Sequence, residues 1–187
     1  MTLRDNVVGT STEFAVFLYA ADNALAGFSF IAAGSYIISR IDLPLTKAGT
    51  PQFNIKAAIW GDSGSTNYHP TALIGTASNE LDANTLPTSD PGTGAWTSFT
   101  GLSASLTNGT RYHVLVYKSS GTSHYYNDSA NWYQLAGLAA DITHESTDFT
   151  TWSEKRTYIK TKFALYEDVA SGPSIPVLMH HYNMLRG

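Results

Sequence analysis

The chain contains no cysteine. This absence excludes a disulfide scaffold, a thiolate zinc site and a cysteine nucleophile, and it leaves the redox compartment open. Charge is also scarce, because charged residues make up 14% of the chain against about 25% in typical soluble domains. The 11 Lys and Arg are scattered along a chain of formal net charge −4. A nucleic-acid interface needs a concentrated basic face, so the composition argues against one.

A long hydrophobic run is missing as well. The longest strongly apolar stretch, residues 14–21, is too short to cross a bilayer. With the Ala-Leu-Ala at residues 24–26 it resembles part of a signal peptide. The positive start of such peptides is absent, however, because Arg4 is balanced by Asp5 and Glu13. The sequence therefore predicts neither a membrane partner nor a secretion signal.

Hydroxyl and aromatic residues take the place of charge. The chain has 22 Thr, 19 Ser, 11 Tyr, 8 Phe and 4 Trp. β-branched and aromatic side chains fit a pleated surface, so this composition is typical of a β protein. The length of 187 residues fits one domain of sandwich size, which buries roughly 70% of its unfolded surface and needs no covalent staples.

Apolar residues alternate with polar ones along several segments. The pattern is clearest in residues 53–60, and residues 111–118 and 158–167 follow it less strictly, with Lys160 and Lys162 expected to face solvent. Such alternation indicates strands that place one face on a core. The side chains expected in that core are Ile55, Ile59, Val114, Val116, Phe163 and Leu165.

Further strands are expected where β-favouring residues lie between turn-forming ones. No segment has helical periodicity over three turns, and residues 80–95 and 136–151 are expected to form long loops. We therefore predict an all-β fold, an antiparallel β-sandwich or jelly roll of about eight or nine strands over residues 1–168. The further strands predicted are residues 13–19, 28–32, 36–43, 72–77, 96–102 and 123–127.

Residues 169–187 differ in kind from the rest of the chain. Gly172, Pro173 and Pro176 prevent the last strand from continuing, yet the segment is too apolar for a solvated tail. It predicts an extended C-terminal arm that lies either on its own domain or on a neighbouring subunit. The residues expected to make that contact are Val177, Leu178, Met179, Tyr182, Met184 and Leu185.

Residues 61–65, Gly-Asp-Ser-Gly-Ser, resemble the nucleophile motif of chymotrypsin-like serine proteases. That family places its catalytic His before the Ser in the chain, whereas the first histidine here, His69, follows Ser63. We therefore interpret the segment as a tight turn after the strand that ends at Trp60.

His144, Glu145 and Asp148 resemble a zincin helix in which the second His is replaced. A zinc site of that kind needs two imidazoles one helical turn apart and a third ligand, so a solvated acidic loop is the preferred interpretation. His180 and His181 are interpreted as docked or exposed arm residues. The sequence also shows neither a phosphate loop nor a dinucleotide fingerprint. We therefore predict no catalytic residue, no metal and no cofactor.

Several aromatic residues fall at strand ends or in expected loops. Flat aromatic faces stack on sugar rings and also suit protein interfaces, while the alternative is that they cap the ends of the core. The residues that could bind a glycan or a protein partner are Trp60, Tyr68, Tyr125, Tyr126, Trp132 and Tyr133.

The order of strands and turns between Phe28 and Tyr166 resembles the choice-of-anchor type of extracellular β-sandwich found in bacteria and phages. The resemblance covers about three quarters of the chain and includes no catalytic motif. It implies a non-enzymatic jelly roll that is related in shape to carbohydrate-binding modules and is displayed on a surface. The matching stretches are residues 35–45, 55–64, 73–76, 96–99, 106–117 and 162–166.

The sequence departs from the bacterial members of this type, because it shows an apolar arm where they carry a sorting signal or membrane anchor. That arm is similar to the ordered arms of phage virion proteins. We therefore expect a non-enzymatic virion structural protein, a capsid decoration protein or another surface appendage, whose partners are copies of itself and other virion proteins. The alternative is a carbohydrate-binding module at an extracellular or cell surface that recognises glycans through its loop aromatics. An enzyme acting on glycans is the least favoured hypothesis.

Overall fold

Short strands joined by turns build the molecule. The computed structural model describes residues 1–7, 13–19, 25–64, 69–88, 96–121, 129–136, 143–146, 153–156 and 159–168. The elements in chain order are β1 (Thr2–Val7), β2 (Glu13–Tyr19), β3 (Leu25–Ile31), β4 (Tyr36–Leu43), β5 (Leu45–Ala48), β6 (Phe53–Asp62), β7 (Pro70–Thr76), β8 (Leu81–Asp82), the 3-10 turn η1 (Ala83–Thr85), β9 (Thr97–Leu106), β10 (Arg111–Gly121), β11 (Ser129–Ala136), β12 (Thr143–Ser146), β13 (Ser153–Arg156), β14 (Ile159–Thr161) and β15 (Phe163–Glu167).

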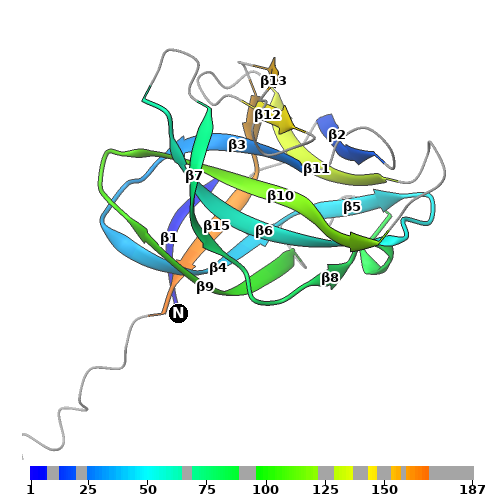
Figure 1. Ribbon diagram of the computed structural model, residues 1–187, viewed down its shortest axis with the longest axis horizontal. Helices are drawn as coiled ribbons and strands as arrows, with labels where there is room; N and C mark the ends of the chain where they lie inside the picture. The colour runs from blue at the N-terminus through cyan, green and yellow to red at the C-terminus, as the bar shows by residue number, and fades with distance from the viewer. Residues whose placement is uncertain are drawn as a thin grey trace, which may run out of the picture.

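The strands form three antiparallel sheets (Figure 1). The largest has the order β13-β12-β3-β10-β6-β7, and β8 pairs with β6 beyond the end of β7. A second sheet has the order β1-β15-β4-β9, and a third has the order β14-β11-β2 with β5 paired to β11. The prediction of an all-β antiparallel sandwich is therefore confirmed, with more and shorter strands than expected.

The core lies between the β3-β10-β6 part of the largest sheet and the β15-β4-β9 part of the second. Phe163 on β15 lies 4.9 Å from Phe28 and 5.4 Å from Phe30 on β3, measured between ring centroids. These contacts join the two sheets directly. All six side chains predicted for the core are buried, with at most 3% of their surface exposed: Ile55, Ile59, Val114, Val116, Phe163 and Leu165.

The two sheets are also tied together by hydrogen bonds where the chain leaves β7. The backbone N–H of Ser78 donates to the carbonyl of Thr100 on β9 at 2.9 Å. Asn79 follows with both ends of its amide, because its Oδ1 accepts from the Thr100 N–H at 2.7 Å and its Nδ2 donates to the Ser98 carbonyl at 3.1 Å. One asparagine side chain thus takes the place of a neighbouring strand for part of β9.

Two glycines make this close approach possible. A Cβ atom on Gly75 would lie 3.0 Å from the Cβ of Ala104 on β9, so β7 and β9 meet almost backbone to backbone. Gly101 has a φ of 74°, in the left-handed region, and a Cβ there would lie 1.9 Å from the Oγ of Ser78. A larger residue at either position would push the sheets apart.

Several expected strands coincide with observed ones. Residues 13–19 and 36–43 are β2 and β4, and the alternating segments 53–60 and 111–118 lie within β6 and β10. The expected strand at residues 123–127 and the arm at residues 169–187 lie outside the described residues.

Three expectations about local structure were wrong. Residues 143–146, placed in a long loop, form β12, which pairs with β3 on one side and β13 on the other. The polar sequence of β12 shows no alternation, so its strand character comes from the hydrogen-bonding edge of β3. Residues 80–95 likewise contain β8 and η1. Lys162, expected to face solvent, is fully buried, because the chain passes there from the β11 sheet into the β4 sheet and the alternation breaks.

The core makes a direct prediction about stability. Replacing Ile59, which is fully buried, with Ala should lower the free energy of unfolding by about 2–5 kcal/mol, because it leaves a cavity between the sheets. The matched substitution Ile31→Ala, on a side chain that is 55% exposed, should cost no more than about 1 kcal/mol. Urea denaturation followed by tryptophan fluorescence measures both, and equal losses would contradict the assigned core.

Candidate functional site

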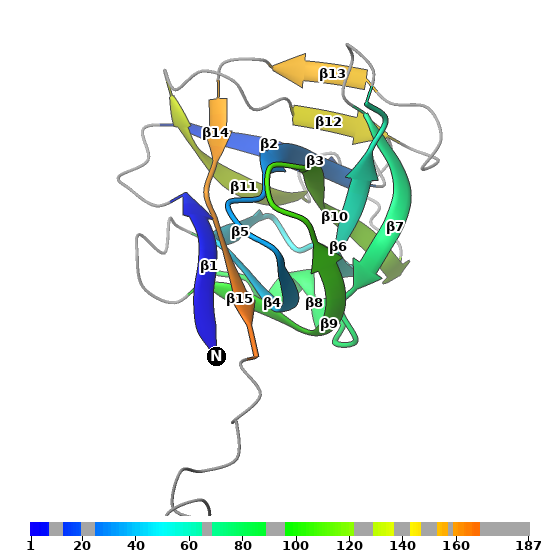
Figure 2. The same ribbon diagram turned by 90° about the vertical axis from the view of Figure 1, so that its left-hand side faces the viewer.

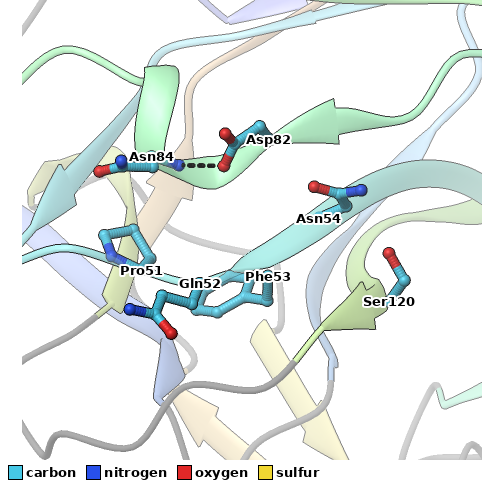
Figure 3. A pocket seen from close by; sticks show the side chains of 7 residues that line it. All are labelled: Pro51, Gln52, Phe53, Asn54, Asp82, Asn84 and Ser120. Atoms are coloured by element: carbon cyan, nitrogen blue, oxygen red, sulfur yellow. Dashed lines mark hydrogen bonds between the residues drawn. The ribbon is translucent and has the colours of Figure 1, made fainter.

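An open pocket of about 280 Å³ lies where β6 begins and β10 ends (Figure 3). Figure 3 shows Asp82 and Asn84 on one side of it, Gln52 and Phe53 on the other, and Asn54 and Ser120 at one end. The residues that line it are Pro51, Gln52, Phe53, Asn54, Asp82, Asn84 and Ser120. Most of these side chains are polar, while Pro51 and Phe53 are apolar and buried.

Strand pairing brings the two sides of this pocket together. Asn54 on β6 lies directly opposite Asp82 on β8. The Asp82 carboxylate then caps η1, because its Oδ1 accepts from the Asn84 N–H at 2.8 Å. Lys47 holds Asn84 from outside, since its ammonium donates to the Asn84 Oδ1 at 2.7 Å and also to the Asn84 carbonyl. The two polar side chains on this side are therefore fixed by the fold.

The end of β10 is anchored in the same way. Glu80 accepts hydrogen bonds at one carboxylate oxygen from the hydroxyls of Ser119, at 2.6 Å, and Ser120, at 2.8 Å. These two bonds lower the pKa of Glu80, with a smaller contribution from a hydrogen bond to the Asn54 side chain. Glu80 thus joins the turn before β8 to the end of β10. Lys118 comes two residues before Ser120 on β10, and its Nζ lies 4.9 Å from the centroid of the Phe53 ring.

A second polar cluster lies on the face of the largest sheet that points away from the core. His113 on β10 is fully buried, and its Nε2 lies 2.8 Å from the Oδ2 of Asp62 at the end of β6. Trp60 and Ser29 are the residues paired with His113 on the two neighbouring strands, and Arg111 donates to the Ser29 hydroxyl at 2.7 Å. Asp62, Arg111 and Ser29 therefore surround one imidazole.

Burial lowers the pKa of His113 to about 4. The hydrogen bond and charge of Asp62 oppose this shift, while the charges of Arg111 and His69 add to it. At neutral pH the imidazole is therefore uncharged, and its Nε2–H donates to Asp62. The uncharged His113 ring therefore serves as a hydrogen-bond donor to Asp62 and places no positive charge among the buried side chains of the sheet.

The Gly-Asp-Ser-Gly-Ser motif begins beside this cluster. The second carboxylate oxygen of Asp62 accepts from the Gly64 N–H at 2.8 Å, which closes an Asx turn. The hydroxyl of Ser63 accepts from the backbone N–H of His69 at 3.2 Å, and the Ser63 N–H donates to the His69 carbonyl at 2.9 Å. The strand runs two residues further than predicted, because Gly61 and Asp62 belong to β6, and the turn begins at Asp62; Ser65 lies outside the described residues.

Three of the six aromatic residues singled out in the sequence lie in the described part of the chain, on two different sheets. Trp60 is half-buried on β6 in the largest sheet, whereas Trp132 and Tyr133 lie on β11 in the third. Tyr68, Tyr125 and Tyr126 lie outside the described residues, as do the arm residues Val177, Leu178, Met179, Tyr182, Met184 and Leu185.

The sequence did not indicate either polar cluster. The pocket residues come from three segments, residues 51–54, 82–84 and 120, which are polar and turn-forming and carry no shared motif. His113 and Asp62 lie 51 residues apart in the chain. The one available signal was the alternation of β6, followed less strictly by β10, which favours their pairing and would bring His113 near Asp62.

Comparison of the sequence with protein-family models and with curated proteins finds no match. Within the described ranges, no group of three or more His, Cys, Asp or Glu is placed to hold a metal ion. The same part of the chain has no helix of the length and apolarity that a membrane span requires.

The depressed pKa of His113 predicts a pH dependence of stability. The unfolded chain takes up this proton below about pH 6.5 and the folded chain only below about pH 4, so the free energy of unfolding should fall as the pH drops between these values. The share of His113 in that fall should be roughly 3 kcal/mol. It should be missing in His113→Gln, where the group cannot titrate.

Urea denaturation at about pH 7.5, 5.5 and 4.5, which span the two pKa values, measures this difference. His69→Gln is the control, and its free energy of unfolding should still fall with pH nearly as much as that of the unchanged protein. A His113→Gln variant whose stability falls as steeply as that of the unchanged protein would contradict the assignment.

Proposed function

We propose that this chain is a non-enzymatic structural protein of a phage virion, a capsid decoration protein or another appendage of the virion surface. Residues 169–187 attach it to a neighbouring copy or to another virion protein. The observation that supports this proposal is the place where that segment begins. It follows β15 in the chain, and β15 is paired with β1 on one side and with β4 on the other.

The end of β15 is firmly fixed. Thr2 on β1 pairs with Glu167, so the start of the chain lies beside the last residues of the sandwich (Figure 2). The Glu167 carboxylate accepts from the Nε of Arg4 at 2.8 Å and from the backbone N–H of Ile37 at 3.4 Å. The hydrogen bond from Arg4 lowers the pKa of Glu167. A segment that starts here is joined to a rigid base.

Exposed apolar residues surround this base. Met1, Leu3 and Ile37 are 60%, 46% and 52% exposed, and each neighbours the pair formed by Thr2 and Glu167. They provide apolar surface whose burial would stabilise contact between subunits. Ordering a long segment costs roughly 1–2 kcal/mol per residue in backbone entropy, so contact is favoured where a neighbour buries both faces of it.

Glycan recognition is a second candidate function. The polar pocket between β6, β8 and β10 favours it, and this function is compatible with a place on the virion surface.

The arm makes the first function testable. Deleting residues 172–187 should leave a folded sandwich whose thermal midpoint is unchanged, because the core lies within the described strands. The truncated protein should be a monomer where the full chain forms oligomers, and light scattering coupled to size-exclusion chromatography measures the mass. A full chain and a truncated chain of the same subunit number would contradict the proposed role of the arm.

A variant of full length separates chemistry from length. Leu178→Ser combined with Tyr182→Ser should abolish assembly as the deletion does, because it removes apolar surface from the arm. The control Asn183→Ser, at a polar position in the same segment, should assemble normally.

A further inference from the structure

We propose that the pocket between β6, β8 and β10 is a binding site for one sugar unit of a glycan. The side chains that hold the sugar are Gln52, Asn54, Asp82, Asn84 and Ser120. This site differs from the loop aromatics considered in the sequence, and it stands independently of the assembly role of the arm.

The hydrogen-bonding direction of each side chain is set by the fold. The Asn84 Oδ1 is occupied by the Lys47 ammonium, which can only donate, so the Asn84 amide offers its N–H groups to a ligand. The Asn54 side chain bonds to Glu80, a carboxylate that can only accept, so Asn54 offers its Oδ1.

The hydrogen-bonding roles of Asp82 and Ser120 are set in the same way. One oxygen of Asp82 accepts from the Asn84 N–H, and the other remains as an acceptor. Ser120 uses its proton on Glu80 and presents oxygen lone pairs. Gln52 is exposed at the rim, where its amide can both donate and accept. The pocket is therefore lined by acceptors on Asp82, Asn54 and Ser120, by donors on Asn84, and by Gln52, which can do both.

A hydroxyl group fits this arrangement because it donates and accepts at the same time. A sugar ring carries several such groups at close spacing, which suits the polar side chains that line the pocket. The volume of about 280 Å³ lies just below the roughly 300–1,000 Å³ typical of pockets for drug-sized ligands, which suits a ligand of one ring.

The charges around the pocket argue against an ion as the ligand. Asp82 is the one charged residue among those that line it, while Lys47 bonds to Asn84 and Lys118 lies over the ring of Phe53, two other lining residues. A cation would meet one ligand-facing carboxylate, that of Asp82, in the presence of two ammonium groups. Hard cations such as Ca²⁺ need six to eight oxygen ligands, several of them carboxylates.

A peptide is also less well suited. Peptides are commonly recognised along an exposed strand edge by backbone hydrogen bonds. Here β6 is already paired with β10 on one side and with β8 on the other, and Pro51 has no N–H to offer. Five of the seven residues that line the pocket have polar side chains (Figure 3).

The test uses the full chain and saturation-transfer difference NMR, which observes the ligand and works at any assembly size. The probes are the methyl glycosides of glucose, galactose, mannose and N-acetylglucosamine, calcium chloride, and N-acetylglycine N-methylamide as a peptide unit. At least one glycoside should show saturable transfer, and it should compete neither with calcium nor with the peptide unit. No transfer to any glycoside, or competition by calcium or the peptide unit, would overturn the proposal.

Three variants locate the site. Gln52→Ala and Asp82→Asn should each weaken the binding of that glycoside roughly three- to tenfold, the loss expected for one hydrogen bond. Asn at position 82 can still cap η1, so the fold is kept. Asn6→Ala, which removes an exposed amide from β1, should bind as the unchanged protein does. Unchanged binding in both pocket variants would overturn the assignment, whatever the arm deletion shows about assembly.

Discussion

The close contact of the end of β7, and of the residues that follow it, with the strand β9 is the constraint on which the rest of the structure depends. Gly75 lies against Ala104, and the Asn79 amide bonds both a carbonyl and an N–H of β9. A β-sandwich is held mainly by apolar side chains between its layers, and such contacts are not directional. The hydrogen bonds of Asn79 add direction, because they fix the position of β9 along the edge of the other sheet.

That constraint continues into the pocket. The chain runs from Asn79 to Glu80, which binds the two serines at the end of β10, and then into β8, which places Asp82 opposite Asn54. Each group takes its position from the one before. The pocket is therefore prepared by the packing of the sheets, and few of its side chains need to be ordered when a ligand binds.

Strand character could be predicted wherever a segment carries its own signal. Residues 36–43 and 53–60 have apolar side chains at the positions that face the core, and both form strands. β12 carries no such signal, because its backbone partners on β3 determine it. For Lys162 a signal was present but misleading. The alternation around it spans β14 and β15, which lie in different sheets, so it did not predict that the side chain is buried. Local pattern predicts strands, but it does not reveal which edge or which sheet they join.

The polar clusters were beyond prediction for a related reason. Both arise from pairings between distant strands, and their members are residue types that also occur in ordinary turns. Asp62 illustrates this. Its motif predicts a turn residue, and Asp62 does close an Asx turn. Its contact with His113 forms because β6 and β10 pair. The register of strand pairing therefore brings polar residues that are far apart in the chain next to one another.

The place of β10 connects the two proposals. It begins at Arg111, beside residues 32–35 that lead into Ile37, and it ends next to the pocket at Ser120. At about 3.3 Å per residue, roughly 30 Å of strand lie between Arg111 and Ser120. A subunit attached through its arm would thus hold the pocket at the far end of the sandwich, away from the surface to which it is bound. Weak binding of one sugar unit per subunit then becomes effective through the number of copies on a particle, without any further contact within each site.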